Sequence, residues 1–427
     1  MQRYFKKASE MSYINRISDA ELQRKLNSAG ALLIRGAKAC GKTESAKQFA
    51  ASILETDRDE QIPFLIETAP QRLLLGKTPR LIDEWQLQPK LWNYVRHEVD
   101  TRKQAAQFIL TGSANPEEDV KMHSGAGRFT VLDMRTMSWQ ELGHSTGKVR
   151  LKNLFEGEKI DIYDEAVDLE FIVEKIIIGG FPGLLGKSPG QASDVNRAYV
   201  DLLAEADMSR VSNTKRDPAK VRKLLRSLAR NSATLVEITT LEKDIREKEF
   251  NDISRPTIYD YLATLDRLMI TENQPAWNTH IRSSASLKKS PKRHFTDVAL
   301  AVAALGADKN SLLNDVKFTG FLFESLAVHE LRIYAQANDA KVYHYRDSSN
   351  LEVDAIVQKY NGDCCAFEIK LGTGQIEEAA ASLNKFVSVL DDRRVALPKS
   401  LNIITGTGIS YTRKDGINVI SLASLGH

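Results

Sequence analysis

Residues 36–43, GAKACGKT, have the residue types and spacing of a loop that binds phosphate. In such a loop, backbone N–H groups surround the phosphates, Lys42 contacts the outer ones and the Thr43 hydroxyl ligates Mg²⁺. The stretch therefore predicts binding of ATP together with Mg²⁺. The residues expected at the nucleotide are those of the loop and the one that follows it: Gly36, Ala37, Lys38, Ala39, Cys40, Gly41, Lys42, Thr43 and Glu44.

The elements on either side of this loop must hold it in place. The apolar run ALLIR at 31–35 predicts a buried parallel strand that ends at the glycine. After the loop, Ala46, Phe49, Ala50 and Ile53 are spaced to form one face of an amphipathic helix. A phosphate-binding loop lies between a strand and a helix, so this context supports the prediction.

Two later apolar runs end in polar residues that suit hydrolysis. In residues 79–86, PRLIDEWQ, Asp83 is expected to hold Mg²⁺ through water and Glu84 to polarise the attacking water. In residues 107–114, QFILTGSA, Thr111 and Ser113 are expected beside the γ-phosphate. An Asp-Glu pair after a strand is also a common helix N-cap. The pattern favours an α/β domain with its site at the carboxyl edge of a parallel sheet.

Residues 123–129, HSGAGRF, predict a polar loop that presents Arg128. An arginine placed there is expected either to stabilise the charge of the transition state or to be an ordinary surface residue. It would act in its own chain or across a subunit interface, and the second case implies a homo-oligomer.

The C-terminal third contains carboxylates that alternation brings together. Glu368 and Lys370 are two apart in one predicted strand, and a hairpin places them beside Asp354 of the strand before. The preceding helix supplies Glu324. Such a group can hold Mg²⁺ and activate water against a phosphodiester. Taken alone, Glu-x-Lys is a common pair on the solvent face of a strand.

The middle of the chain predicts two short helices followed by a strand, an order typical of a winged helix. The second helix, in residues 254–270, offers Thr257, Tyr259 and Asp260 to a DNA groove, or packs as a lid or a subunit contact. The basic run SLKKSPKRH at 286–294 is expected to contact the phosphate backbone or to be a solvated hairpin.

The ordered set GAKACGKT, RLIDEWQ, FILTGSA, HSGAGRF and MRTMSWQELG (134–143) resembles a bacterial and archaeal group of AAA-type ATPases. In that group the ATPase precedes a C-terminal domain long described as of unknown function. The C-terminal pattern resembles restriction-endonuclease-like nucleases, D…E-x-K with an upstream helix glutamate, although Val353 replaces the proline of the motif. This resemblance implies that Asp354 and Glu368 are metal ligands, Glu324 an accessory ligand and Lys370 the residue that orients or deprotonates the water.

Composition is that of a globular protein with two or three domains: 427 residues, 42% hydrophobic and 27% charged, with a net charge of +3. Three cysteines and no long apolar segment predict a cytoplasmic protein without a membrane anchor. The expected α/β architecture is an AAA-type P-loop ATPase at 1–150, a helical and winged-helix-like region at 151–295 and a restriction-endonuclease-like domain at 296–427.

The expected function is ATP hydrolysis coupled to metal-dependent cleavage or binding of nucleic acid, with DNA as the partner. The alternative is a nucleotide-gated regulatory or scaffold protein whose nuclease-like domain is inactive. Metal-dependent nicking of DNA would discriminate between the two.

Overall fold

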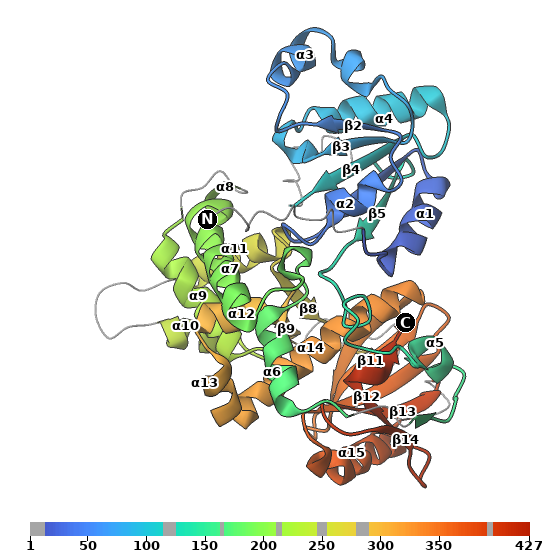
Figure 1. The fold of residues 1–427 in the computed structure, drawn as a ribbon, viewed down its shortest axis with the longest axis vertical. Helices are drawn as coiled ribbons and strands as arrows, with labels where there is room; N and C mark the ends of the chain where they lie inside the picture. The colour runs from blue at the N-terminus through green and yellow to red at the C-terminus, as the bar shows by residue number, and fades with distance from the viewer. Residues whose placement is uncertain are drawn as a thin grey trace, which may run out of the picture.

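The computed structural model describes residues 13–113, 125–162, 166–210, 216–245, 254–278, 290–390 and 396–427. Figure 1 shows an N-terminal α/β unit at one end of the long axis. At the other end, a helical middle region lies beside a C-terminal sheet (Figure 1). None of the helices in these residues is both long and apolar enough to cross a membrane.

The N-terminal unit is built on a five-stranded parallel sheet of order β2-β3-β4-β1-β5. Along β1, Ala31 and Leu33 pack on one side of the sheet while Leu32 and Ile34 pack on the other. Helices therefore cover both faces, as the apolar run predicted. The strands are β1 Ala31–Arg35, β2 Ser52–Glu55, β3 Arg80–Asp83, β4 Phe108–Gly112 and β5 Phe129–Asp133, and the helices are α1 Ser18–Ser28, α2 Lys42–Lys47, α3 Ile62–Thr68 and α4 Leu91–Arg102.

The helix after the phosphate-binding loop is shorter than its spacing predicted. Helix α2 ends at Lys47, and Ile53 belongs to the edge strand β2, where it pairs with Leu81. Phe49 and Ala50 still pack against the core on that side. The helical spacing of Ile53 is therefore accidental. Pairing of β2 with β3 determines the extended conformation of this residue.

The middle region combines eight helices of the described residues with one hairpin. Its helices are α6 Leu169–Ile178, α7 Pro189–Leu202, α8 Met208–Arg210, α9 Pro218–Arg230, α10 Ile238–Ile245, α11 Arg255–Arg267, α12 Val298–Leu305 and α13 Lys309–Asn314. Strands β8 Thr271–Gln274 and β9 Lys292–Phe295 pair antiparallel, and Thr234 between α9 and α10 bridges to Arg293. Helix α11 begins after Ser254, whose side chain accepts from the backbone N–H of Thr257.

The C-terminal unit is a seven-stranded mixed sheet of order β10-β11-β12-β13-β15-β14-β7. Alternate residues of β12 enter two cores: Cys365, Phe367 and Ile369 pack on the side of the long helix α14 Val316–Ala337, and Cys364 and Ala366 on the side of α15 Ile376–Val389. The strands are β7 Asp161–Ile162, β10 Ala340–Arg346, β11 Glu352–Lys359, β12 Cys364–Lys370, β13 Ser400–Thr405, β14 Ser410–Thr412 and β15 Asn418–Ser421.

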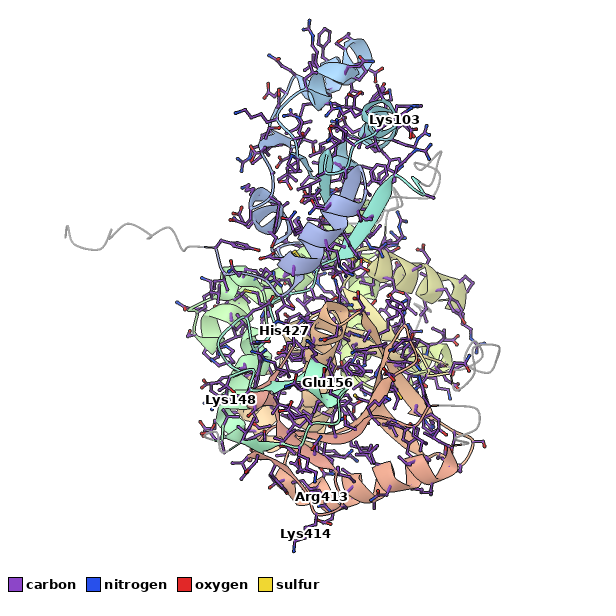
Figure 2. The ribbon with its side chains drawn as sticks, turned by 90° about the vertical axis from the view of Figure 1, so that its right-hand side faces the viewer. Lys103, Lys148, Glu156, Arg413, Lys414 and His427 are labelled. Atoms are coloured by element: carbon purple, nitrogen blue, oxygen red, sulfur yellow. The ribbon has the colours of Figure 1, made fainter. Side chains whose placement is uncertain are left out.

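The segment that leaves the ATPase unit pairs with strands of the C-terminal unit. Strand β7 pairs with β14, and β6 Val149–Arg150, which precedes α5 Leu151–Leu154, pairs with β16 Leu425–Gly426. Figure 2 shows His427 between Lys103 of the N-terminal unit and Lys414 at the far end of the C-terminal unit. Composition gave no sign of pairings between residues so distant in the chain.

Candidate nucleotide site and C-terminal charged cluster

The phosphate-binding loop connects the carboxyl end of β1 to α2, as predicted. A Cβ at Gly36 would lie 2.1 Å from the backbone oxygen of Met134, so only glycine fits there. Ala39 and Gly41 have positive φ angles of 65° and 107°, which turn the loop around the Lys42 side chain. Lys42 Nζ donates to the carbonyl oxygens of Gly36 and Ala37, each at 2.9 Å. The loop therefore surrounds the Lys42 ammonium group, and Lys42 as a whole is only 5% exposed.

Three polar side chains predicted at the nucleotide site meet beside this loop. Thr43 Oγ1 donates to Asp83 Oδ1 at 2.8 Å, and Thr111 Oγ1 donates to the same oxygen. They come from α2 and from the carboxyl ends of the adjacent strands β3 and β4. Hydroxyl and carboxylate oxygens are ligands that Mg²⁺ prefers, so the residues fit this ion. Lys42, Thr43, Asp83 and Thr111 are thus brought together as the spacing indicated.

Glu84 is held by a neighbour that sequence reasoning missed. Its backbone is left-handed, with φ 52° and ψ 40°. Gln86 Nε2 donates to Glu84 Oε2 and lies 3.4 Å from Ser113 Oγ. A Cβ at Gly112 would meet Gln86 Oε1 at 2.6 Å, so the glycine makes room for this amide. Gln86 is the last residue of the predicted stretch at 79–86. Its polar side chain, two residues after Glu84, was the feature of the sequence that could have indicated this contact.

Arg128 lies at the opposite edge of the sheet from the phosphate-binding loop. Its backbone oxygen accepts from Ala31 N, the first residue of β1, at 3.1 Å, and its Nε lies 2.7 Å from Asp100 Oδ1. The five-residue length of β1, about 16 Å at ~3.3 Å per residue, separates it from the loop. Because β5 runs parallel to β1, Arg128 lies at the end of these strands away from the phosphate-binding loop of its own chain, and its action on a nucleotide stays a prediction. His123 and Ser124 of the same predicted loop lie outside the described residues.

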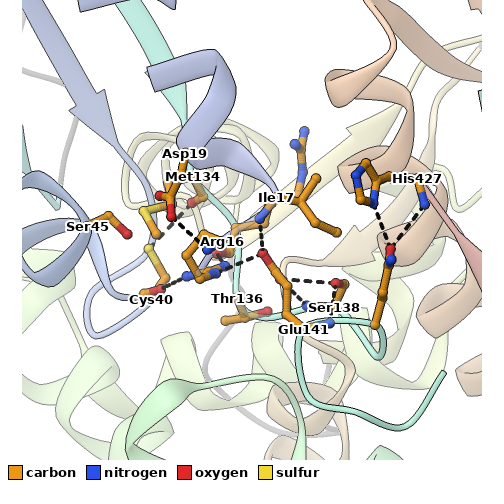
Figure 3. A network of polar contacts seen from close by, with 12 residues as sticks. Arg16, Ile17, Asp19, Cys40, Ser45, Met134, Thr136, Ser138, Glu141 and His427 are labelled. Carbon is orange, nitrogen blue, oxygen red and sulfur yellow. Dashed lines mark hydrogen bonds and ion pairs between the residues drawn. The ribbon is translucent and has the colours of Figure 1, made fainter. Parts of the chain in front are cut away.

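A buried ion pair lies beside the phosphate-binding loop and is hydrogen-bonded to it (Figure 3). Arg16 Nε donates to Glu141 Oε1 at 3.0 Å, and the two side chains are 5% and 3% exposed. The same guanidinium donates to the backbone oxygens of Cys40 at 3.0 Å and Arg135 at 2.9 Å. Glu141 also accepts from Ser138 N at 2.7 Å. The segment after β5 is thereby attached to the loop, in the stretch at 134–143 that carried the resemblance.

The same segment contacts the long helix of the C-terminal unit. Thr136 Oγ1 lies 3.0 Å from His329 Nε2, and Trp139 N donates to Glu330 Oε2 at 2.9 Å. Both partners lie on α14, which also carries Glu324. The nucleotide loop and the C-terminal cluster are therefore joined through one short, largely buried segment.

Glu272 of the β8–β9 hairpin lies in a partly buried ionic group beside that segment. Arg135 Nε donates to Glu272 Oε2 at 2.9 Å, and Arg332 Nη1 lies 3.6 Å from the same oxygen. Burial acts to raise the pKa of Glu272, but the two guanidinium groups outweigh it and hold this pKa well below its usual value.

The C-terminal carboxylates are brought together as predicted, in a row that alternates with two lysines. Lys370 Nζ lies 2.7 Å from Glu368 Oε2 and 3.4 Å from Asp354 Oδ2. On the other side, Lys292 Nζ lies 3.3 Å from Asp354 Oδ1 and 2.7 Å from Glu324 Oε1. The order is Glu324, Lys292, Asp354, Lys370, Glu368, and alternation on β11 and β12 explains the second half of it.

The charges of this row depend on one another. Burial raises the pKa of Glu324 and of Glu368, while Lys292 and Lys370 act in the opposite direction. Burial also acts to raise the pKa of Asp354, but the two lysines hold it below its usual value. Across the parts of the chain that the structure describes, no three His, Cys, Asp or Glu residues are placed to hold a metal. The donor set suits Mg²⁺, but the observed arrangement, with lysines between the carboxylates, does not.

Lys292 also corrects the interpretation of the basic run at 286–294. Lys292 and His294 are 4% and 1% exposed, and both point at α14, where His294 Nδ1 lies 2.9 Å from Ser325 Oγ. They share a face of β9 because they are two residues apart. This part of the run is therefore unavailable to a phosphate backbone, and residues 286–289 lie outside the described residues. Composition alone did not show that Lys292 lies among the C-terminal carboxylates.

Comparison with known proteins divides the chain into three parts. Residues 28–143 match the model of an AAA domain, residues 169–311 a domain of unknown function (DUF8612) and residues 319–425 another domain of unknown function (DUF4143). The match at 28–143 and the site geometry identify the N-terminal unit as an AAA-like P-loop ATPase domain.

Relatives are similar over most of the chain. Uncharacterized proteins of Mycobacterium bovis and Mycobacterium tuberculosis are each 24% identical over 356 residues, which cover 82% of this chain and 72% of theirs. Among solved structures, the Walker-type ATPase PABY2304 of Pyrococcus abyssi is 13% identical, with a TM-score of 0.42, and the match covers 68% of this chain and 96% of that one.

Proposed function

We propose that this protein hydrolyses ATP with Mg²⁺ at the carboxyl edge of the N-terminal sheet. The observation that carries the proposal is the single carboxylate oxygen of Asp83, which accepts from both Thr43 and Thr111 beside Lys42. Bound Mg²⁺ would offset the charge of the β- and γ-phosphates, with Thr43 and Asp83 holding it.

The other residues at this edge have separate tasks in the proposed reaction. Lys42 exchanges the loop carbonyls for phosphate oxygens, because a charged phosphate is the stronger acceptor. Glu84 polarises the attacking water, and Gln86 holds its carboxylate in position. Thr111 and Ser113, at the end of β4, contact the γ-phosphate.

Two variants separate binding from hydrolysis. Lys42→Ala is expected to abolish tight binding of a fluorescent ATP analogue, whereas Glu84→Gln is expected to bind it normally and release phosphate at least ~100-fold more slowly. Lys90→Ala is the matched control, because Lys90 lies in the same unit outside the phosphate-binding loop, with its side chain 62% exposed. Normal turnover in the Glu84 variant would remove that residue from the mechanism.

The second candidate function belongs to the C-terminal unit, which we propose acts on nucleic acid, with DNA as the expected partner. The gathering of Glu324, Asp354, Glu368 and Lys370 supports a nuclease-type site on a restriction-endonuclease-like fold. Purified protein incubated with plasmid DNA or RNA and Mn²⁺ is expected to nick its substrate, and Asp354→Asn to eliminate nicking while ATP hydrolysis continues. If the wild type cleaves neither, the domain serves the alternative function, a nucleotide-gated scaffold.

Contacts to DNA are proposed for the middle region. The order α9, the Thr234 bridge, α10, α11 and the β8–β9 hairpin supports a winged-helix-like arrangement. Tyr259 is 60% exposed on α11, whereas Asp260 lies 2.9 Å from Arg216 Nη2. Tyr259→Ala is expected to weaken binding to a labelled duplex, and Tyr360→Ala, another exposed tyrosine, to leave it unchanged. Equal affinity in both variants would make α11 a packing helix.

A further inference from the structure

A positive charge already lies between two of the carboxylates proposed as metal ligands. Lys292 Nζ is 2.7 Å from Glu324 Oε1 and 3.3 Å from Asp354 Oδ1. The Lys292 side chain is 5% exposed, so water screens this charge little. A divalent metal bound to the same two oxygens would need this space.

The other oxygen of Asp354 and both oxygens of Glu368 also have hydrogen-bond partners. Asp354 Oδ2 accepts from Ile369 N at 2.9 Å and lies 3.4 Å from Lys370 Nζ. Glu368 accepts from Lys370 through Oε2 at 2.7 Å and from Ser382 through Oε1 at 2.9 Å. Two ammonium groups among three carboxylates leave at most one net negative charge, which is a weak attraction for a divalent cation.

We propose that Lys292 is an internal cation that competes with a divalent metal for Glu324 and Asp354, so that the metal binds only when Lys292 is withdrawn. The proposal rests on the proposed nuclease-type site and adds the residue that decides whether a metal enters it. It explains why the carboxylates meet as the nuclease pattern requires without leaving a place for a metal.

The β8–β9 hairpin, which carries Lys292 on β9, contacts both the C-terminal cluster and the segment after the ATPase sheet. On β8, Gln274 pairs with Lys292 and donates to the backbone oxygen of Asp354 at 2.9 Å. Glu272 of the same strand is bonded to Arg135, directly after the ATPase sheet. The position of Lys292 is therefore set by a hairpin held between the ATPase unit and the cluster.

Metal binding without nucleotide tests the proposal. Mn²⁺ is titrated by calorimetry into the full chain carrying Asp83→Asn, which removes the carboxylate ligand of the ATP site. With Lys292 intact and no nucleic acid present, weak or no binding is expected. Adding Lys292→Met is expected to tighten Mn²⁺ binding at least tenfold, at one ion per chain, and adding Asp354→Asn as well is expected to abolish it.

Controls keep the result specific. Lys317→Met removes a lysine from an exposed position of α14 and is expected to leave Mn²⁺ binding unchanged. Lys292→Gln, which keeps polar atoms toward the carboxylates, replaces Lys292→Met if that chain does not fold. Tight Mn²⁺ binding by the chain that retains Lys292, lost with Asp354→Asn, would overturn the proposal, as would a folded Lys292 variant that binds no better.

The two proposals for this site fail in different ways. If Lys292→Met binds Mn²⁺ but cleaves no nucleic acid, the competition is real and the nuclease function fails. If the wild type cleaves nucleic acid in Mn²⁺ at full rate and Lys292→Met adds neither binding nor rate, the nuclease function stands and the competition fails.

Discussion

Removing the carboxylate of Glu141 should destabilise the ATPase unit far more than breaking a surface ion pair. Glu141→Ala leaves the Arg16 guanidinium buried without its carboxylate partner, in a place where the two side chains are 5% and 3% exposed. Breaking one side of a buried pair costs about 3–5 kcal/mol. Arg24→Ala breaks the pair with Asp339, whose side chains are 57% and 59% exposed, and should cost about 0–1 kcal/mol.

The free energy of unfolding is measured by urea denaturation, followed by tryptophan fluorescence, since Trp139 lies two residues from Glu141. ATP affinity is the second readout. Arg16 Nη1 donates to the Cys40 carbonyl of the phosphate-binding loop, and a charged hydrogen bond contributes about 1.5 kcal/mol or more. Disturbing it should weaken ATP binding by about tenfold. A cost below about 1 kcal/mol for Glu141→Ala, equal to that of Arg24→Ala, would refute the reasoning from burial.

Three further predictions concern other parts of the molecule. Gln86→Ala should slow phosphate release by about tenfold with ATP affinity unchanged, because one hydrogen bond positions Glu84, whereas Gln88→Ala should change neither quantity. The lowered pKa of Glu272 means that its ion pairs stabilise the fold above the unfolded pKa of about 4.3, and that this stabilisation is lost as the pH falls below that value. Glu272→Gln should therefore be less stable than the wild type at neutral pH and should lose less stability on acidification. Melting curves recorded from pH 7 to 3 measure both effects. Arg128 is proposed to act across a subunit boundary, so mixing Arg128→Ala with Lys42→Ala chains should restore part of the ATPase activity, and a fully active monomer by light scattering would exclude this.

The nucleotide site was predictable because its residues are set by local patterns. A strand, a glycine-rich turn and a helix determine where Lys42 and Thr43 lie, and parallel strands bring Asp83 and Thr111 to the same edge. Alternation along two strands likewise grouped Asp354 with Glu368 and Lys370. These predictions require only the local sequence around each residue and the general geometry of β-sheets.

The missed features depend on contacts between distant segments. A basic run shows charge but not which residue points inward, so the burial of Lys292 appears only once β9 packs against α14. The ion pair of Arg16 and Glu141 joins residues separated by 125 positions, and no local period marks it. The sequence placed Arg128 on a loop but left open where that loop points, because this depends on which end of the sheet the loop joins.

The pairing of β6 and β7 with the distant strands β16 and β14 has a consequence for folding during synthesis. Residues 149–162 leave the ribosome well before their partners in β14 and β16, which begin about 250 residues later. At a synthesis rate of about 5–20 residues per second, the backbone N–H and C=O groups of these residues lack their strand partners for roughly 12–50 s. The ATPase unit can fold during that interval, whereas the C-terminal sheet gains the edge strand β7 only after β14 has been made. A ribosome that stalls near residue 400 therefore displays an unpaired strand edge, which is a site of attachment for chaperones or for a neighbouring chain.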